Sequence, residues 1–397
     1  MLAAPPKVAP LTEKDLGHWK LLDSFRAHLE RALRTHRLPA SWEDPKRKLA
    51  APDYLSLFLF GLLNPVTQTL RGLSAASELA RVQEEVCGGR VPRATFSDAQ
   101  QVLDPALLEK VFADLSAQIP PAPHDARLGQ WQWLAHDGSL FAALPRMSWA
   151  LYGGGRAKAS GKAACAVKLH LSLHVLADKP VRATVRPGKE CERKVWQEHW
   201  EKGAAYLGDR LFAQNYQLLA KLENKGCAYV LRLKEQTHLV VEEALAVSAE
   251  DRAAGVERQA WVRLGKDAAK RSGRVRVVWI AGEKEPVILV TNLAPASLSA
   301  ALVSQLYRQR WKIELFFRWV KCLLGCGHWL AESQAGVTIQ IYLALIAALL
   351  LQLYAGRRPT QRMLELIRWY LCGVASGAEL ERGLEQYRRE LERRKKS

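Results

Sequence analysis

One long uncharged apolar stretch limits how this chain can fold. It runs from Ile339 to Tyr354 and reads IQIYLALIAALLLQLY. Such a stretch must be covered by lipid or by other parts of the protein, because apolar surface is unfavourable in water. It contains glutamines and tyrosines and falls short of the roughly 20 residues that a membrane span needs. We therefore expect a buried helix within a protein core, and no membrane partner.

Length and charge narrow the class of protein further. The chain has 397 residues, of which 49% are apolar, enough for two or three domains with a large core. Its 58 basic and 40 acidic residues give a formal net charge of +18. A surplus of this size favours a polyanionic partner, since each neutralised phosphate releases a counterion. The alternative is a basic enzyme whose charges are merely solvated.

The cysteines and the N-terminal residues indicate a compartment. The 7 cysteines are odd in number and scattered, which does not suit a disulfide framework and indicates reducing conditions. The N-terminal segment MLAAPPKVAPLTEKD contains acidic residues and no apolar core, unlike a signal peptide. We expect a cytoplasmic protein.

The first 130 residues are predicted to be mostly helical. Apolar residues recur at helical spacing over Leu21–Leu33, Leu55–Leu63 and Leu107–Leu115. Before the third of these segments, a Cys-Gly-Gly turn is followed by Pro92 and by Thr95 or Ser97 as a candidate helix cap. This pattern fits a helix-turn-helix, but equally any two helices joined by a tight turn. A proline-rich linker follows from Ala117 to Asp125.

The pattern changes to strands at Trp131. Val167–Val175 alternates between apolar and polar residues, as a half-buried strand does. Four further short apolar segments are predicted as strands: Trp131–Asp137, Arg182–Pro187, Ala204–Asp209 and Cys227–Lys234. A helix over Phe212–Asn224, ended by Gly226, separates the last two. Three neighbouring strands followed by strand–helix–strand predict an α/β core with a mixed sheet.

A second group of strands interrupts this core. Residues 238–286 hold three short segments typical of antiparallel strands, and helix resumes at Ser299. We therefore predict five regions. They are a helical N-terminal domain with a role in DNA binding (1–130), the first part of the core (131–237), a β-rich insertion (238–290), the second part of the core (291–355) and a basic helical tail (356–397).

Two carboxylates end strands that we expect to be neighbours. Asp137 closes the first predicted strand and Asp209 closes the fourth. A strand end is a rigid position that opens into the crevice above a sheet, where catalytic groups are often found. An acid after a strand also occurs in ordinary turns, so this pair alone indicates little.

The helix after the insertion adds a third carboxylate. It reads LYRQRWKIELFFRWVKCLL from Leu306 to Leu324. At about 100° per residue, Glu314 shares about 100° of one face with two aromatic residues and three cations, which are Tyr307, Trp311, Arg310, Arg318 and Lys321. A glutamate among cations suits a metal-bound phosphate, because the acid binds the metal and the cations bind phosphate oxygens. The alternative is a solvated amphipathic helix with an Arg310–Glu314 ion pair.

These residues resemble the DDE transposases of bacterial insertion sequences. The helix matches the family signature Y-x2-R-x3-E-x6-K at Tyr307, Arg310, Glu314 and Lys321. Upstream segments resemble the family's first-aspartate motif, second strand and second-aspartate motif, namely HDGS at His136–Ser139, KLH at Lys168–His170 and GDRLF at Gly208–Phe212. The segments YVLRLK and LVTNL also fit. The resemblance covers roughly Trp131 to Ala355.

The resemblance implies an RNase H-like catalytic core with a β insertion, flanked by helical regions. It implies that Asp137, Asp209 and Glu314 are catalytic and bind two Mg²⁺ ions, for which Mn²⁺ can substitute. The implied partner is double-stranded DNA, as inverted-repeat ends and as target, held by a homodimer on paired ends in the bacterial nucleoid. The alternatives are a domesticated nuclease or recombinase of the same fold, and a catalytically inactive DNA-binding protein.

Seven residues are predicted to contact DNA. They are Tyr307, Arg310, Lys321, Arg318, Arg210, Trp261 and Trp279. The two tryptophans lie in predicted strands of the insertion and are candidates to stack an unpaired base during end processing. The alternative for both is a place in the insertion's own core.

Three other patterns in the sequence are weaker indications of function. The segment from Tyr152 to Lys162 resembles a phosphate-binding loop but lacks its first glycine and its final Ser or Thr, so we predict a basic loop near DNA. Cys322, Cys326 and His328 lack a fourth zinc ligand at a usual spacing. The strand histidines, His170 and His174, are predicted to be packing residues.

Overall fold

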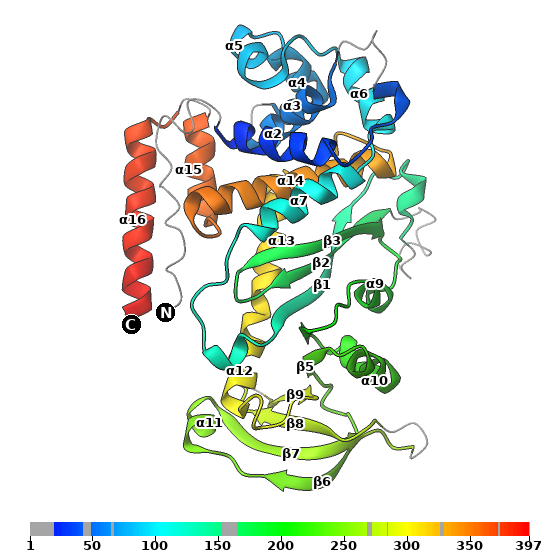
Figure 1. The fold of residues 1–397 in the computed structure, drawn as a ribbon, viewed down its shortest axis with the longest axis vertical. Coiled ribbons are helices and arrows are strands. Elements are labelled where there is room, and N and C mark those ends of the chain that lie inside the picture. The colour runs from blue at the N-terminus through cyan, green and yellow to red at the C-terminus, as the bar shows by residue number, and fades with distance from the viewer. Residues whose placement is uncertain are drawn as a thin grey trace.

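A nine-stranded mixed sheet runs through the protein (Figure 1). The computed structural model describes residues 20–42, 49–64, 67–152, 165–267, 272–283, 285–325, 329–371 and 374–396. The strand order is β3-β2-β1-β4-β5-β9-β8-β7-β6. The strands are β1 (Gln132–Ala142), β2 (Ala166–His174), β3 (Lys179–Pro187), β4 (Ala204–Gly208), β5 (Ala228–Arg232), β6 (Leu239–Leu245), β7 (Val256–Leu264), β8 (Val275–Ile280) and β9 (Val287–Thr291).

The first five strands form the part of the sheet that the sequence predicts as the core. β1, β2 and β3 pair antiparallel to one another, whereas β4 pairs parallel with β1 and β5 parallel with β4. This confirms the predicted α/β core with a mixed sheet.

The β insertion extends this sheet instead of forming a separate one. β9 pairs antiparallel with β5, and β8, β7 and β6 follow in antiparallel order. The insertion contains four strands where the sequence predicted three, together with the short helix α11 (Ala249–Ala253). β6 escaped prediction because Glu242 and Glu243 are adjacent, which breaks the alternation. A β-bulge between Val241 and Glu243 accommodates the extra residue.

Helices cover both faces of the first half of the sheet. The helices of the described residues, besides α11, are α2 (Lys20–Leu33), α3 (Ala51–Leu63), α4 (Leu70–Ala76), α5 (Ala80–Val82), α6 (Arg93–Val102), α7 (Ala106–Ala117), α9 (Glu192–Glu198), α10 (Tyr216–Asn224), α12 (Ala300–Gln309), α13 (Trp311–Leu323), α14 (Gln334–Ala355), α15 (Gln361–Leu371) and α16 (Gly377–Lys396). One apolar core joins α13, α14 and the N-terminal helices to one face of β1, and a second core joins α9 and α10 to the other face.

The apolar stretch noted in the sequence is the buried helix α14. Among the described helices, α14 is the one that is long and apolar enough to cross a membrane. In the structure, however, 89% of its most apolar part is buried inside the protein. It contacts α3 and α7 as well as α13 and β3. The Ser333 side chain caps its start and Gly356, at φ 70°, ends it. The N-terminal helices therefore share a core with the catalytic sheet.

The N-terminal candidate for a helix-turn-helix consists of α4, α5 and α6. α5 continues into a π-helical turn over Gln83–Cys87 that ends at Gly88, with φ 62°. α6 begins at Arg93 directly after Pro92, so neither of the two predicted capping residues caps it. The DNA-binding role of this region stays a prediction.

Candidate active site

The first two predicted acids lie at one edge of the β1–β4 pair. In the parallel register Ala135 lies beside Leu207, and Asp137 and Asp209 each follow two residues later. β4 has ended by then, whereas β1 continues along its antiparallel partner β2. Asp137 therefore stands inside a long strand and not at its end as predicted, next to the space that the end of β4 leaves open.

Backbone N–H groups orient both aspartates. Asp137 Oδ1 accepts a hydrogen bond from the N–H of Gly138 at 2.8 Å, and Asp209 Oδ1 accepts one from the N–H of Leu211 at 2.8 Å. β4 is closely packed just before Asp209, because a β-carbon at Gly208, its last residue, would lie 2.8 Å from a leucine side chain of β5. The local sequence thus fixes each carboxylate at the end of the crevice.

The carboxyl group of Asp137 is buried near two other acids. Its pKa is raised to about 7, chiefly by burial; the Gly138 N–H lowers it, the carboxylates of Glu192 and Asp209 raise it, and Arg310 lowers it. Acids that raise one another's pKa in this way favour binding of a cation.

The third acid, Glu314, lies on α13, which packs against β1 and β2. The predicted single helix is divided at Arg310, where the N–H of Arg310 bonds the carbonyl of Tyr307 and the helix tightens between α12 and α13. Arg310 Nη2 donates to Glu314 Oε1 at 2.8 Å, and its guanidinium lies 5.8 Å from the centre of the Tyr307 ring. Arg310 also influences the pKa of Asp137, so it links the third acid to the first.

The donor set fits a hard divalent cation. All three predicted ligands are carboxylates, which suit Mg²⁺ or Mn²⁺. Among the described residues, no three His, Cys, Asp or Glu side chains are close enough to share one ion, and Glu314 is paired with Arg310. Burial is the main cause of the raised pKa of Asp137, and the nearby carboxylates of Glu192 and Asp209 add to it.

Three of the cations that were predicted to contact DNA lie in different places in the structure. Lys321 lies over Phe141, farther along β1 from Asp137, with its Nζ 5.3 Å from the ring centre. Arg210 follows Asp209 and forms an ion pair with Glu235 at 3.5 Å. Arg318 is exposed and lines a pocket of about 300 Å³ with residues that include Asp178 and Arg357. The helical projection had grouped Arg318 with Glu314, whereas the structure turns it toward the C-terminal helices.

The two tryptophans of the insertion differ in exposure. Trp279 is 3% exposed and belongs to the core shared with α10, with the Arg258 guanidinium 4.1 Å from its ring centre. Trp261 is only half-buried, with Arg274 5.0 Å from its ring centre. The structure therefore favours the packing alternative for Trp279 and leaves Trp261 as the candidate for base stacking.

Sequence reasoning missed Glu192 and Arg232. Glu192 begins α9, a helix between β3 and β4 that the sequence analysis did not predict. The signal was the apolar pair Val195 and Trp196 among charged residues, which is compatible with one helical turn facing a core. Arg232 at the end of β5 acts with Arg310 to lower the pKa of Tyr307, against the dominant effect of burial.

A buried polar cluster lies beside the site. His136 Nδ1 and His199 Nδ1 each contact Ser172 Oγ at 3.0 Å, and the rings of His136 and His170 stack 6.4 Å apart. His174 Nδ1 accepts a hydrogen bond from the N–H of Ala177. The strand histidines thus take part in packing, as predicted.

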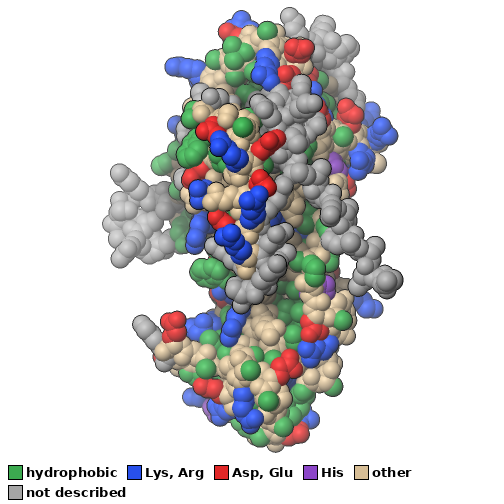
Figure 2. All heavy atoms as spheres, turned by 90° about the vertical axis from the view of Figure 1, so that its left-hand side faces the viewer, with side chains coloured by type: hydrophobic (Ala, Val, Ile, Leu, Met, Phe, Trp, Pro, Cys, Tyr) green, Lys and Arg blue, Asp and Glu red, His purple; other side chains and the backbone are tan. Residues whose placement is uncertain are grey.

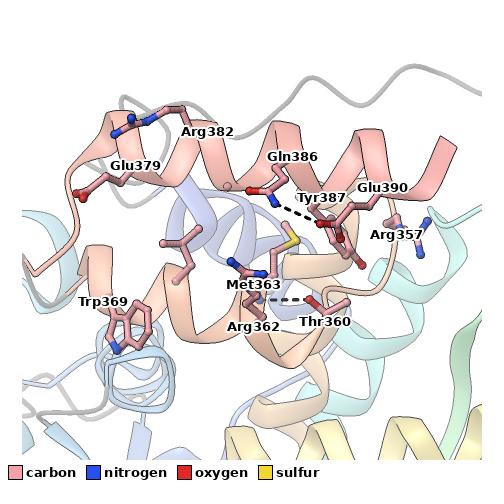
Figure 3. A pocket seen from close by; sticks show the side chains of 12 residues that line it. Arg357, Thr360, Arg362, Met363, Trp369, Glu379, Arg382, Gln386, Tyr387 and Glu390 are labelled. Carbon is pink, nitrogen blue, oxygen red and sulfur yellow. Dashed lines mark hydrogen bonds between the residues drawn. The ribbon is translucent and has the colours of Figure 1, made fainter. Parts of the chain in front are cut away.

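Another cavity lies between the C-terminal helices (Figure 3). It measures about 650 Å³ and is lined by residues of α15 and α16 and the loop before them, including Arg357, Arg362 and Trp369. At Gly383 the helices approach so closely that a β-carbon would lie 2.3 Å from Leu366. None of the three catalytic candidates lines this cavity.

Two sequence predictions lie outside the described residues. The predicted basic loop runs from Tyr152 to Lys162, and all of it except Tyr152 lies outside the described residues. Cys326 and His328 are likewise outside, so the structure describes only Cys322 of the zinc candidates.

Comparison with known proteins identifies relatives over the same region. A family model described as the transposase DDE domain matches residues 132–350. The protein named as the transposase of insertion sequence element IS5377 of Geobacillus stearothermophilus is 26% identical over 208 residues, covering 52% of each chain. That of element IS4SA of Synechocystis sp. is 24% identical over 299 residues, 72% of this chain and 79% of that one.

The alignments differ in how much of each relative they span. The chain spans about half (52%) of the Geobacillus relative. A cryo-EM structure of the piggyBac transposase synaptic complex with hairpin DNA is 12% identical with a TM-score of 0.43, covering 94% of this chain and 80% of that one. The family match covers more than half of the chain, including both aspartates and the glutamate helix. The chain therefore belongs to the family of DDE transposase domains.

Proposed function

We propose that this protein is the transposase of a bacterial insertion sequence, which binds the ends of its element, cuts them and joins them to a target. The observation that carries the proposal is the placement of Asp137 and Asp209 at one edge of the β1–β4 pair, within the region that matches the transposase DDE domain. Each aspartate lies two residues beyond the paired residues Ala135 and Leu207, and Glu314 lies on a helix packed against β1.

The three acids would hold two Mg²⁺ ions. When bound, such ions activate the attacking oxygen and stabilise the leaving oxygen in a displacement at phosphorus. The protein's part is to hold the carboxylates apart from one another at fixed strand and helix positions, which the backbone hydrogen bonds to Asp137 and Asp209 accomplish.

Arg310 is the side chain best placed to receive DNA phosphate. Its Nε is buried and has no hydrogen-bond partner among the described residues, although its Nη2 is bonded to Glu314. An unpaired buried guanidinium N–H is unfavourable until an acceptor arrives, and a phosphate oxygen is such an acceptor. Lys321 and Tyr307 extend this contact along α12 and α13, and Arg210 extends it beyond β4.

Double-stranded DNA is the proposed partner, in the form of inverted-repeat ends and of target. The net charge of +18 supports a polyanion in general. On the face that includes α16, basic side chains alternate with acidic ones (Figure 2), so the surplus is not concentrated there. We also propose a homodimer on paired ends, located with the bacterial nucleoid.

The test is strand transfer by the purified protein. Linear DNA carrying the sequences that flank the gene is incubated with Mg²⁺ and a supercoiled target, and cut and joined products are resolved on gels. Products that depend on the flanking sequences support the proposal. Cutting irrespective of end sequence would indicate the nuclease alternative, and binding without cutting would indicate an inactive DNA-binding protein.

A further inference from the structure

The β insertion packs against the helix that leads to the glutamate. α12 carries Tyr307, and Arg310 follows its last residue. This helix contacts α11 as well as β7 and β8 of the insertion, besides β5 of the core (Figure 1). Whatever fixes the start and the direction of α12 therefore also fixes where Tyr307 and Arg310 lie.

Two buried side chains of the insertion contact the start of α12. Asp251 is 5% exposed, and its Oδ1 accepts a hydrogen bond from the N–H of Ala301 at 2.7 Å, while its Oδ2 accepts one from the N–H of Ser248 at 3.0 Å. The first N–H groups of a helix have no partner within the helix, and a carboxylate there also interacts favourably with the helix dipole. Arg276 is fully buried on β8 and donates from Nη1 to the carbonyl oxygen of Leu298, just before the helix begins.

The buried guanidinium of Arg276 is costly for the insertion on its own. Burial lowers the pKa of Arg276 to about 10, and Asp251 raises it. The Nε of Arg276 donates to Gln259 Oε1 at 3.0 Å, but its Nη2 has no hydrogen-bond partner among the described residues. Apolar side chains often stabilise a buried position as well as or better than charged ones do. The geometry that Arg276 imposes on the chain before α12 explains its presence better than stability does.

A second set of hydrogen bonds continues along the helix. Ser304 Oγ donates to the carbonyl oxygen of Ala254 at 3.0 Å, and the Arg308 guanidinium donates to the same oxygen at 3.4 Å. Ala254 directly follows α11. Since Ala301, Ser304 and Arg308 are three and four residues apart, they share one face of α12. The insertion is thus bonded to α12 from its first turn to its last.

We propose that Arg276 and Asp251 are positioning residues, which hold α12 against the insertion and so set where Tyr307 and Arg310 stand at the active site. The proposal rests on the proposed function, because it takes Tyr307 and Arg310 as contacts to DNA phosphate. The alternative is that Arg276 and Asp251 only stabilise the insertion.

The first experiment measures amide hydrogen exchange of the whole protein without DNA. Asp251→Ala should speed exchange of the α12 amides by about tenfold, because a bond to the first turn is lost, while β1 exchanges as in the wild type. Ser304→Ala should act in the same direction, and it tests the inference even if Asp251→Ala folds poorly. The control is Ser272→Ala, whose hydroxyl group bonds Leu264 and Gly273 within the insertion. The control should leave exchange in α12 unchanged.

The second experiment is a double-mutant cycle on affinity for cut DNA ends, measured by fluorescence anisotropy. Asp251→Ala and Arg310→Ala should each weaken binding, and the double variant should weaken it by less than the product of the two fold-changes, because Asp251 acts partly through Arg310. Ser272→Ala combined with Arg310→Ala should show no such coupling. Asp251→Asn keeps an oxygen acceptor for the N–H of Ala301 and should recover most of the affinity.

The outcomes separate this inference from the proposed function. Unchanged exchange in α12, or fold-changes in affinity that simply multiply, would overturn the inference and leave the proposed function standing. If Arg310→Ala alone leaves the affinity for DNA unchanged, the proposed phosphate contact fails. The exchange of α12 in Asp251→Ala and Ser304→Ala then decides whether the insertion holds this helix.

Discussion

The two halves of the nine-stranded sheet differ in how they are covered. β3-β2-β1-β4-β5 have helices on both faces, with α13 and α14 on one side and α9 and α10 on the other. The insertion half ends at β6, a strand whose residues are all exposed or half-buried. The same backbone pairing therefore continues from a buried environment into an open one.

This difference separates two kinds of polar group. In the covered half, burial raises the pKa of Asp137 and lowers that of His170 to about 3. In the open half, Glu242 forms ion pairs with Arg263 and Arg274 on the surface. Charges on an edge strand discourage pairing with other strands. The covered half holds the buried carboxyl group of Asp137, whereas the acids of the edge strand β6 are exposed.

The largest expected effect is the loss of cleavage when a catalytic acid is removed. Asp137→Ala, Asp209→Ala and Glu314→Ala should each lower DNA cleavage by at least about a thousandfold, because each removes a metal ligand, and should leave DNA binding largely intact. Cleavage on end-labelled DNA and binding by gel shift measure the two. Glu243→Ala, an acid of the open half, is the control and should cleave normally. Near-normal cleavage by any one catalytic variant would remove that acid from the site.

The insertion tryptophans should respond in opposite ways. Trp279→Ala should destabilise the protein by about 3–5 kcal/mol, as for a large core aromatic, measured by denaturant unfolding. Trp261→Ala should fold normally and leave first-strand nicking intact, but slow the second processing step about tenfold to a hundredfold, because it removes about 1–3 kcal/mol of base stacking. A fully active Trp261→Ala would exclude the stacking role.

His170 should make the covered half sensitive to acid. Its pKa is lowered from 6.5 to about 3 by burial and by nearby cations, Lys168 first, so the unfolded chain takes up the proton first as the pH falls. The wild type therefore loses stability below about pH 6.5, by about 1.4 kcal/mol per pH unit from this group.

His170→Phe should remove that loss of stability. The substitution breaks no hydrogen bond of the ring, because both ring nitrogens of His170 lack hydrogen-bond partners among the described residues. The difference in stability between wild type and variant is measured by thermal unfolding in EDTA from about pH 7.5 to about pH 4.5, a range that brackets the ordinary His pKa of about 6.5. Asp137→Asn is the opposite-sign control. The pKa of the wild-type Asp137 carboxyl is raised to about 7, so the wild type gains stability as the pH falls through that value. The Asp137→Asn variant lacks this gain. A pH-independent difference for His170→Phe would contradict the assignment.

The smallest effects should come from single phosphate contacts. Arg310→Ala and Lys321→Ala should each reduce the slope of log affinity against log salt by about one unit, which fluorescence anisotropy on cut ends can measure. Tyr307→Phe should be milder than Tyr307→Ala if the ring is the main contributor. Arg318→Ala is the matched control on the same helix, since it faces the C-terminal helices. If the salt slopes of Arg310→Ala and Lys321→Ala equal those of Arg318→Ala and the wild type, the helix face that carries Arg310 and Lys321 does not contact DNA.

The sequence alone determined the family of this protein and the order of its parts. Asp137, Asp209 and Glu314 could be named as candidates because two of them follow short apolar segments and the third shares a helix face with cations at a characteristic spacing. The apolar run of α14 could be assigned to a core because it contains glutamines and tyrosines and falls short of a membrane span. These features are local, since a few neighbouring residues determine them.

Only the tertiary structure decided what depends on contacts between distant segments. It showed that the insertion extends the catalytic sheet, because strand pairing between β5 and β9 is not encoded in either strand alone. It divided the glutamate helix at Arg310 and turned Arg318 away from the acids, which an ideal helical projection cannot foresee. It brought Glu192 to Gly138 and Lys168, three residues from three elements, and their approach is set by packing rather than by spacing along the chain.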